Sequence, residues 1–254
     1  MSEKRRLFVD QNRLIDQLDS NRKILLNTNE SHYLSRVLRM RSGDLLAVVD
    51  GKGHLWNAEI VGEKIIRLTT KFDSPIQRVS RDKPLICIAV AMPKKGFESF
   101  LQMSCEIGVD VIQPLISKRS VVKGNSNEKI KRWEKIICEA VEQSERLWKP
   151  ELRQTLKLQK WINYLPPDAH VAFASTRIDE LQDCLEWLND MTLKVNQTWI
   201  AIGPEGGWDK DEENFAFENG LVGISIGDTI LRTSTAAVSA CQLMILSRRL
   251  KSCP

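Results

Sequence analysis

Two glycine-containing segments near the C-terminus carry the residues best suited to bind a small ligand. Gly203-Pro-Glu-Gly-Gly207 directly follows an apolar stretch, 198–202, that is predicted as a strand. Gly227-Asp-Thr-Ile-Leu-Arg-Thr-Ser-Thr-Ala236 runs into a predicted helix over 233–250. Because glycine has no Cβ, the backbone can approach a ligand closely, and two such loops at neighbouring strand ends can form walls of a cofactor pocket. Their spacing is not Gly-x-Gly-x-x-Gly, so the dinucleotide-binding fingerprint is absent.

A long predicted helix over 127–147 contributes a second group of polar residues. One of its faces carries Lys135, Glu139, Glu142, Gln143 and Arg146. Two interpretations stay open. The face is either a polar rim beside the cofactor pocket, or a solvent-exposed surface on which Glu142 and Arg146 form a weak ion pair four residues apart.

Familiar nucleophilic and metal-binding motifs are absent. The sequence has no Gly-x-Ser-x-Gly elbow, no Walker A loop and no Cys-x-x-Cys pair among its six cysteines. Most of these cysteines lie in apolar stretches, which is typical of buried thiols. We expect structural or surface roles for His54 and His170, whereas His32 lies either near RNA or on the surface. The sequence therefore predicts no metal centre and no catalytic triad.

The composition predicts a globular protein with a basic N-terminal part. The chain has 254 residues, of which 42% are hydrophobic and 28% charged, and this length suits two domains. It contains no apolar run of 18 residues and no secretory leader pattern, so we expect a reduced, cytoplasmic protein without a membrane partner. Residues 1–80 contain 14 Lys and Arg against 10 Asp and Glu, which accounts for the whole net charge of +4. A polyanionic partner or a solvated surface would explain this excess.

The first third of the chain reads as a small β-barrel. Short β-rich segments at 6–9, 23–27, 44–50, 55–61 and 64–70 are separated by turn signals. One predicted helix over 32–39, with Asn29 or Ser31 as its N-cap, interrupts them. A polar, proline-bounded stretch follows the last strand. We therefore predict a domain over 1–73 and a linker over 74–84.

Strands and helices alternate in the remaining domain, 85–254. Predicted strands are 85–91, 110–114, 171–174, 198–202 and 222–226, and predicted helices are 96–107, 127–147, 178–188, 209–219 and 233–250. Such alternation indicates an α/β fold with a parallel sheet covered by helices on both faces. Ligands bind at the carboxyl ends of strands in these sheets, where both glycine loops lie.

Four blocks in sequence order then resemble the bacterial 16S ribosomal RNA (uracil-N3)-methyltransferase family of the SPOUT superfamily. The blocks are Arg6-Leu-Phe-Val9 with His32-Tyr-Leu-Ser-Arg-Val-Leu-Arg39, Pro93-Lys-Lys-Gly96 with Cys105-Glu-Ile-Gly-Val109 and Pro114, Glu139-Ala-Val-Glu-Gln-Ser-Glu-Arg146 with Pro150, and the two glycine loops. Together they span nearly the whole chain.

The resemblance implies a SPOUT-type parallel sheet with a C-terminal trefoil knot, an exception to the rule that chains do not thread. It also implies a PUA-like RNA-binding barrel at the N-terminus, a homodimer, and S-adenosylmethionine as cofactor. The implied reaction methylates N3 of one uridine in the 16S ribosomal RNA of the small subunit, either as free RNA or in the assembled subunit. A competing hypothesis is a non-catalytic RNA-binding protein with a degenerate methyltransferase fold. A nicotinamide-dependent oxidoreductase is disfavoured because the dinucleotide fingerprint is missing.

The resemblance also assigns candidate site residues. The implied cofactor-binding residues are Ile202, Gly203, Glu205, Gly206, Ile226, Gly227, Leu231, Thr235 and Ala236. The implied substrate-binding residues are Arg36, Arg39, Arg119, Glu142, Gln143 and Arg146. Arg232 and Arg146 are catalytic candidates, with Arg232 stabilising a uracil oxyanion or orienting a phosphate. Glu205 is either the general base or a cap for the helix that begins near 209.

One position departs from the family pattern. The family commonly has an acid where this chain has Ser234. A hydroxyl cannot act as a base at neutral pH, so either that acid is not essential to the chemistry, or this chain is impaired or acts on a different target.

Overall fold

The computed structural model describes residues 5–122, 124–176, 178 and 181–252. Their backbone forms two compact units. The first unit combines the chain up to Arg81 with Cys138–Lys149, and the second combines Asp82–Ile137 with the chain from Pro150 onward. The division into a barrel over 1–73, a linker over 74–84 and a methyltransferase domain over 85–254 stays a prediction.

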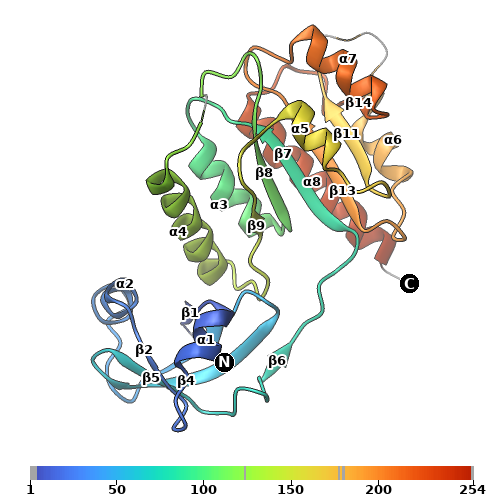
Figure 1. Cartoon of the computed structure of the whole chain (residues 1–254). Helices are drawn as coiled ribbons and strands as arrows, with labels where there is room; N and C mark the ends of the chain where they lie inside the picture. The colour runs from blue at the N-terminus through green and yellow to red at the C-terminus, as the bar shows by residue number, and fades with distance from the viewer. Residues whose placement is uncertain (1–4, 123, 177, 179–180, 253–254) are drawn as a thin grey trace. The chain divides into compact units, whose positions relative to one another are not determined.

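The first unit is built on a mostly antiparallel sheet (Figure 1). Its strand order is β1 (Arg6–Phe8), β3 (Leu45–Val49), β4 (His54–Gly62), β5 (Ile65–Leu68) and β2 (Lys23–Leu25), and the short β6 (Gln77–Arg78) pairs with β4. Only the pairing of β1 with β3 is parallel. Alternate strand residues face a buried core that includes Leu7, Ile24, Leu46, Trp56 and Ile66. The five predicted strand segments are confirmed.

Helices in this unit begin where side chains cap them. Helix α1 (Gln11–Gln17) is capped by Asp10, and α2 (Thr28–His32) is followed by one π-helical turn, η1 (Tyr33–Val37). The predicted start near residue 32 is wrong, as are Asn29 and Ser31 as caps. Asn27 is the N-cap, because its side chain accepts from the backbone of Glu30 while the Glu30 carboxylate accepts from the backbone of Asn27.

Helix α4 (Asn127–Gln143) is the long helix that the sequence predicts, but it ends four residues early. Glu145 has φ of 59°, in the left-handed region, so the helix cannot continue through it. Helix α4 contributes residues to both units, since the second unit ends its first segment at Ile137.

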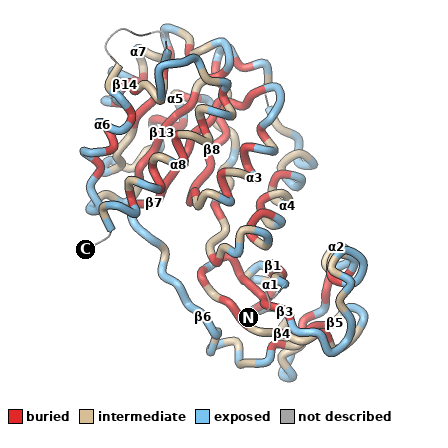
Figure 2. The backbone as a smooth tube through the Cα atoms, turned by 180° about the vertical axis from the view of Figure 1, so that it is seen from behind, coloured by how far each residue is buried: buried red, intermediate tan, exposed pale blue. Residues whose placement is uncertain are grey.

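The second unit contains a parallel sheet, as predicted. The strand order is β10 (Leu156–Lys157), β8 (Val111–Ile116), β7 (Leu85–Ala91), β13 (Gln197–Ile202), β11 (His170–Ala174), β14 (Val222–Ser225) and β12 (Gln182–Asp183), with β9 (Glu151–Leu152) also paired to β8. Every pairing among these strands is parallel. The central strands are almost wholly buried (Figure 2).

Helices cover both faces of this sheet. Helix α8 (Thr233–Ser252) packs on α3 (Phe97–Ile107) and β7, and lies behind the sheet in Figure 1. Helices α5 (Leu158–Asn163) and α7 (Lys210–Glu218) pack on each other on the opposite face. Their core includes Trp161, Trp199 and alternate residues of β7.

The predicted helix over 178–188 is partly wrong. Residues 182–183 form β12, and α6 (Cys184–Asn189) begins only after them, where Asp183 accepts from the backbone of Leu185. Positions 177, 179 and 180 lie outside the described residues. None of the described helices is long and apolar enough to cross a membrane.

Candidate active site

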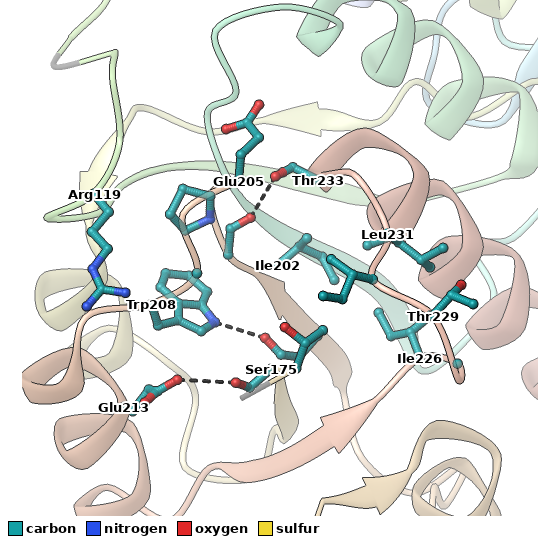
Figure 3. A pocket seen from close by; sticks show the side chains of 18 of the residues that line it. Arg119, Ser175, Ile202, Glu205, Trp208, Glu213, Ile226, Thr229, Leu231 and Thr233 are labelled. Atoms are coloured by element: carbon teal, nitrogen blue, oxygen red, sulfur yellow. Dashed lines mark hydrogen bonds between the residues drawn. The ribbon is translucent and has the colours of Figure 1, made fainter. Parts of the chain in front are cut away.

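A cavity of about 410 Å³ lies in the second unit, at the carboxyl ends of β11, β13 and β14. Both glycine loops line it, and so do residues 174–176, which follow or end β11. Figure 3 shows side chains of these segments pointing toward a common space. The position agrees with the rule that parallel sheets bind ligands where their strands end.

Trp208 holds two of these strand ends together. Its side chain is 4% exposed, and its indole Nε1 donates a hydrogen bond of 2.9 Å to the carbonyl of Ala174. A Cβ on Gly203 would lie only 3.1 Å from the indole ring. Because glycine has no Cβ, the turn after β13 can pack directly on the tryptophan without displacing it.

The second glycine loop is fixed to the first at the start of α8. The hydroxyl of Thr233 is buried and donates a hydrogen bond of 2.9 Å to the carbonyl of Gly203 (Figure 3). Across the cavity, the Ser175 hydroxyl donates to Glu213 of α7 at 3.2 Å. These bonds set the distance between the cavity walls without any bound ligand.

Basic residues from the end of β8 reach the same region. The exposed Arg119 donates through Nη1 to the carbonyl of Gly206 at 3.1 Å, and its Nη2 lies 3.9 Å from Asp209. The neighbouring Lys118 bonds both Asp209 and Asp211. Its pKa is raised by these two carboxylates, and the pKa of Asp209 is lowered mainly by Lys118. The charge of Lys118 is therefore balanced by two carboxylates, and Arg119 is the basic residue of this segment that lines the cavity.

Helix α7 is capped by its own residues. The Asp209 side chain accepts from the backbone of Asp211, and the Glu212 carboxylate accepts from the backbone of Asp209 at 3.0 Å. The predicted alternative in which Glu205 caps this helix is therefore wrong. Glu205 is exposed and lines the cavity instead.

A separate small cavity, of about 50 Å³, lies within the first unit beside the end of α4. Glu142 accepts a hydrogen bond of 2.8 Å from the backbone N–H of Phe8, and Gln143 donates to the Tyr33 hydroxyl at 3.1 Å. Burial raises the pKa of Glu142 to about 7, against the lowering effect of the Phe8 bond, and the charges of Glu139 and Glu30 raise it further. The polar face of α4 thus includes a half-buried carboxyl that binds the backbone of β1.

Comparison with known proteins gives two family matches. Residues 81–245 match an RNA methyltransferase domain, and residues 26–71 match an RNA methyltransferase PUA domain. The chain belongs to the RNA methyltransferase family. The resemblance found in the four sequence blocks is thereby confirmed, and the first unit contains the PUA-like part.

Two curated relatives are both named ribosomal RNA small subunit methyltransferase E. The one from Synechocystis sp. is 33% identical over 222 residues, which cover 85% of this chain and 71% of the relative. The one from Buchnera aphidicola is 29% identical over 231 residues, which cover 89% and 88%.

Two solved structures of similar proteins contain S-adenosylmethionine. The ribosomal RNA small subunit methyltransferase E from Neisseria gonorrhoeae matches with a TM-score of 0.77 at 26% identity, over 95% of this chain and 97% of that one. A putative methyltransferase from Legionella pneumophila matches with a TM-score of 0.80 at 27% identity, over the same shares. The α/β fold of this family member is therefore that of cofactor-bound methyltransferases.

The structure brings most of the predicted cofactor residues of this methyltransferase to one cavity. Those that line it are Ile202, Gly203, Glu205, Ile226, Gly227, Leu231 and Ala236. Gly206, Thr235 and Arg232 are exposed and lie next to lining residues in the chain. Arg119, predicted as a substrate residue, lines the same cavity. The roles of all these residues stay predictions.

The other predicted substrate residues belong to the first unit. Arg36 and Arg39 are exposed around η1, and Glu142, Gln143 and Arg146 lie at the end of α4 or just after it. Glu142 contacts the backbone of β1, and Gln143 contacts the Tyr33 hydroxyl.

Sequence reasoning missed several cavity residues. Ala174, Ser175, Thr176, Trp208 and Glu213 all line it. The first three could have been predicted, because they lie at the end of the predicted strand over 171–174, and parallel strands end at the same edge of the sheet. Nothing local indicates Trp208 or Glu213, since their partners lie 34 and 38 residues away.

Histidines and cysteines have the structural roles expected of them. His54 Nδ1 lies 2.7 Å from a buried Asp50 carboxylate, and His170 stacks on Trp187, where burial lowers its pKa. His32 is exposed, and Cys87 and Cys105 are buried. No group of three metal-ligating side chains occurs within the described ranges.

Proposed function

We propose that this chain transfers the methyl group of S-adenosylmethionine to N3 of one uridine in the 16S ribosomal RNA of the small subunit. The observation that carries the proposal is the cavity at three parallel strand ends, closed by the Gly203–Trp208 contact. The names of the curated relatives and the cofactor bound to two solved relatives support it.

The residues of the cavity fit this cofactor. Its volume of about 410 Å³ falls within the usual range for small-molecule sites. Ile202, Ile226 and Leu231 offer apolar surface for a flat adenine ring, and the loops offer backbone donors and acceptors. A Cβ on Gly227 would meet no atom within 4 Å, so the backbone there faces open space that a ligand can approach. When bound, S-adenosylmethionine supplies a methyl group on a positively charged sulfur.

N3 of uracil carries a proton at neutral pH, and this proton must be removed before or during methyl transfer. Glu205 is the exposed carboxylate on the first glycine loop and is our candidate to accept that proton. Arg232 and Arg119 are the cations placed to stabilise negative charge on the uracil oxygens or to orient a phosphate. N3 faces the partner base in a duplex, so the uridine must be unpaired or flipped out.

Residues of the first unit hold the RNA in this proposal. Glu142, Gln143 and Arg146 are our candidates for holding RNA bases, and Arg36 and Arg39 are candidates for binding phosphates. The basic balance of residues 1–80 supports an RNA-binding role for the PUA-like part.

Ser234 is consistent with an active enzyme. It is not among the cavity residues, and its hydroxyl would lie 3.6 Å from a Cβ on Gly96. A residue that faces Gly96 rather than the cavity is not required as a base, so we infer that the family acid at this position is not essential to the chemistry.

We further propose the finer features that the family resemblance implies: a C-terminal trefoil knot, a homodimer, and action in the cytoplasm, where ribosomal RNA is found. The family match over residues 81–245 supports the knot, because the knot is a feature that the resemblance implies. Sedimentation of the purified chain tests the dimer.

The direct test is mass spectrometry of small-subunit ribosomal RNA from a strain that lacks the gene. We expect N3-methyluridine to disappear and to return when the gene is restored. Its persistence would exclude this chain as the required enzyme. Calorimetry with S-adenosylmethionine and with NAD separates the alternatives, because RNA binding without affinity for the methyl donor would indicate a non-catalytic RNA-binding protein.

Arg232 gives a residue-level test of the same proposal. We expect Arg232→Ala to lower turnover strongly while leaving S-adenosylmethionine affinity within a few-fold, since the side chain is exposed outside the cavity lining. Arg232→Lys serves as the matched variant that keeps the charge. A large loss of cofactor binding with an unchanged rate at saturation would contradict the assigned role.

A further inference from the structure

A second cavity lies along the edge of the parallel sheet, away from the glycine loops. It measures about 540 Å³ and is lined by β9, β10, the segment between them, α5 and the residue that follows α5. In the sheet, β8 and β10 lie on one side of β7, whereas the strands that end at the methyl-donor cavity lie on the other. We call this second cavity the edge groove.

The edge groove exists because the sheet edge is interrupted. Strands β9 and β10 each contribute only two residues to the pairing with β8. Between them, the backbone N–H of Arg153 donates to the Ile112 carbonyl at 2.9 Å, and the Gln113 side-chain amide donates to the Gln154 carbonyl at 2.7 Å. The chain is therefore held beside β8 while its side chains turn toward the groove.

An exposed aromatic ring forms one wall of the groove. Tyr164 is 67% exposed, so its ring is open to a ligand in the groove. The Lys160 ammonium lies 5.9 Å from the centre of the Tyr164 ring. Lys160 forms no salt bridge with any residue in the part of the chain that the structure describes.

A second cation, Arg153, lines the same groove. Glu151 accepts a hydrogen bond of 3.0 Å from Nε of Arg153 and thereby orients the guanidinium, whose carbon lies 5.3 Å from the centre of the Trp199 ring. Trp161, which also lines the groove, is 1% exposed and packs on Trp199.

We propose that the edge groove binds a single-stranded segment of RNA. One base stacks on Tyr164, and Lys160 and Arg153 contact the phosphates. Aromatic rings beside cations are the usual means by which proteins hold unpaired nucleotides, because every base has a face to stack and every phosphate a charge. An acidic peptide would use the cations but would leave the ring without a stacking partner. This inference rests on RNA being the substrate class of the proposed function.

Strand β8 and the residues just after it contribute to both cavities. Gln113 of β8 lines the groove, and Arg119, three residues beyond the end of β8, lines the methyl-donor cavity. We expect RNA held in the groove to extend toward Arg119, so that the groove acts as a substrate-positioning site.

The test measures binding of a fluorescein-labelled, 12-nucleotide oligouridine to the full chain by fluorescence anisotropy. We expect Tyr164→Ala to weaken binding by about tenfold, because the variant loses the ring on which one base stacks. Tyr164→Phe keeps the ring and should bind like the wild type. Lys160→Ala should reduce the slope of log K against log salt by about 0.7, the value for one phosphate contact on a single strand.

Lys157→Ala is the matched control, because Lys157 is exposed on β10 but does not line the groove. Unfolding midpoints check that each variant is folded. Binding by Tyr164→Ala and Lys160→Ala equal to that of Lys157→Ala would overturn the inference, as would stronger competition by polyglutamate than by unlabelled RNA. Calorimetry with S-adenosylmethionine and methylation assays on the same samples keep the two proposals apart. If the wild type binds the cofactor and methylates RNA, and the groove variants bind RNA as well as the wild type does, only the inference about the groove is overturned.

Discussion

Gly203 lies at a closely packed point of the cavity wall. Its missing Cβ leaves room for the Trp208 indole, and its carbonyl accepts from Thr233. Three segments of the chain therefore meet at one small residue: the turn after β13, the indole that bonds Ala174, and the start of α8. A side chain here would disturb all three at once.

We expect Gly203→Ala to weaken S-adenosylmethionine binding by about tenfold, because overpacking of a close contact costs about 1–3 kcal/mol. Isothermal calorimetry measures the effect. Gly124→Ala is the control, since a Cβ on Gly124 would meet no atom within 4 Å. Equal affinities for the two variants would show that the indole moves without consequence for the ligand.

Glu142 provides a pH-dependent test. Burial raises its pKa from an ordinary 4.5 to about 7, so the folded protein keeps a proton that the unfolded chain has already lost between these values. The free energy of unfolding should therefore fall as pH rises from about 5 to 7, by up to about 1.4 kcal/mol for each unit of pKa difference.

Glu142→Gln is the variant that isolates this effect. It removes the titrating proton and retains an oxygen that can accept from the Phe8 N–H. In urea denaturation between pH 5 and pH 7, we expect the wild type to lose stability relative to this variant. Parallel curves for the two proteins would mean that Glu142 titrates as an ordinary exposed acid.

Single residues were predictable from the sequence where the signal is local. The glycine loops were found because glycine beside a strand end has a recognisable spacing, and seven of the nine predicted cofactor residues line the cavity. Trp208 and the Glu142–Phe8 bond were not found, because they join residues 34 and 134 positions apart. Helical periodicity places Glu142 and Gln143 near each other but does not say what they contact.

At the scale of elements, length decides what the sequence can predict. Strand β7 is an apolar run of seven residues, and β13 ends in an apolar run of four, so both were expected. Strands β9, β10 and β12 have two residues each, which is too short for any period to appear. The alternation of helices and strands indicated a parallel sheet but carried no information on threading of the chain, so the knot came only from the family resemblance.

Helix α7 gives an element-scale prediction. Glu212 is 1% exposed, and its carboxylate accepts from the backbone of Lys118 and Asp209 and from the Ser117 hydroxyl. We expect Glu212→Ala to lower the free energy of unfolding by about 2 kcal/mol or more, because buried donors would lose their acceptor. Glu212→Gln keeps one oxygen and should lose less.

Chemical denaturation measures these changes, and Glu218→Ala, an exposed position on the same helix, is the control. If Glu212→Ala were no more destabilising than Glu218→Ala, the carboxylate would not connect α7 to the end of β8. Loss of that connection should also reduce RNA affinity, since Arg119 lies in the same segment.

At the scale of the whole molecule, the first unit is not one continuous segment. The backbone N–H of Gly53 donates to the Leu147 carbonyl at 2.9 Å, and that of Lys149 donates to the Gly51 carbonyl at 3.0 Å. Arg6 also pairs with Glu145. Composition and turn signals reveal linkers, but they cannot show that the chain returns to an earlier unit, so the sequence did not predict this contribution of 138–149.

We therefore expect a fragment of residues 1–81 to lack cooperative unfolding by itself. It would expose the backbone donors and acceptors of Gly51, Gly53 and Phe8 that the later segment satisfies. A fusion in which a flexible Gly-Ser linker joins residue 81 to 138–149 should restore a cooperative urea transition, measured by far-ultraviolet circular dichroism. Glu142→Ala in that fusion should weaken the transition, because the Phe8 N–H would lose its acceptor. A fragment of 1–81 with the same midpoint as the fusion would show that the barrel is complete without α4, and would favour the predicted domain over 1–73 as an independent folding unit.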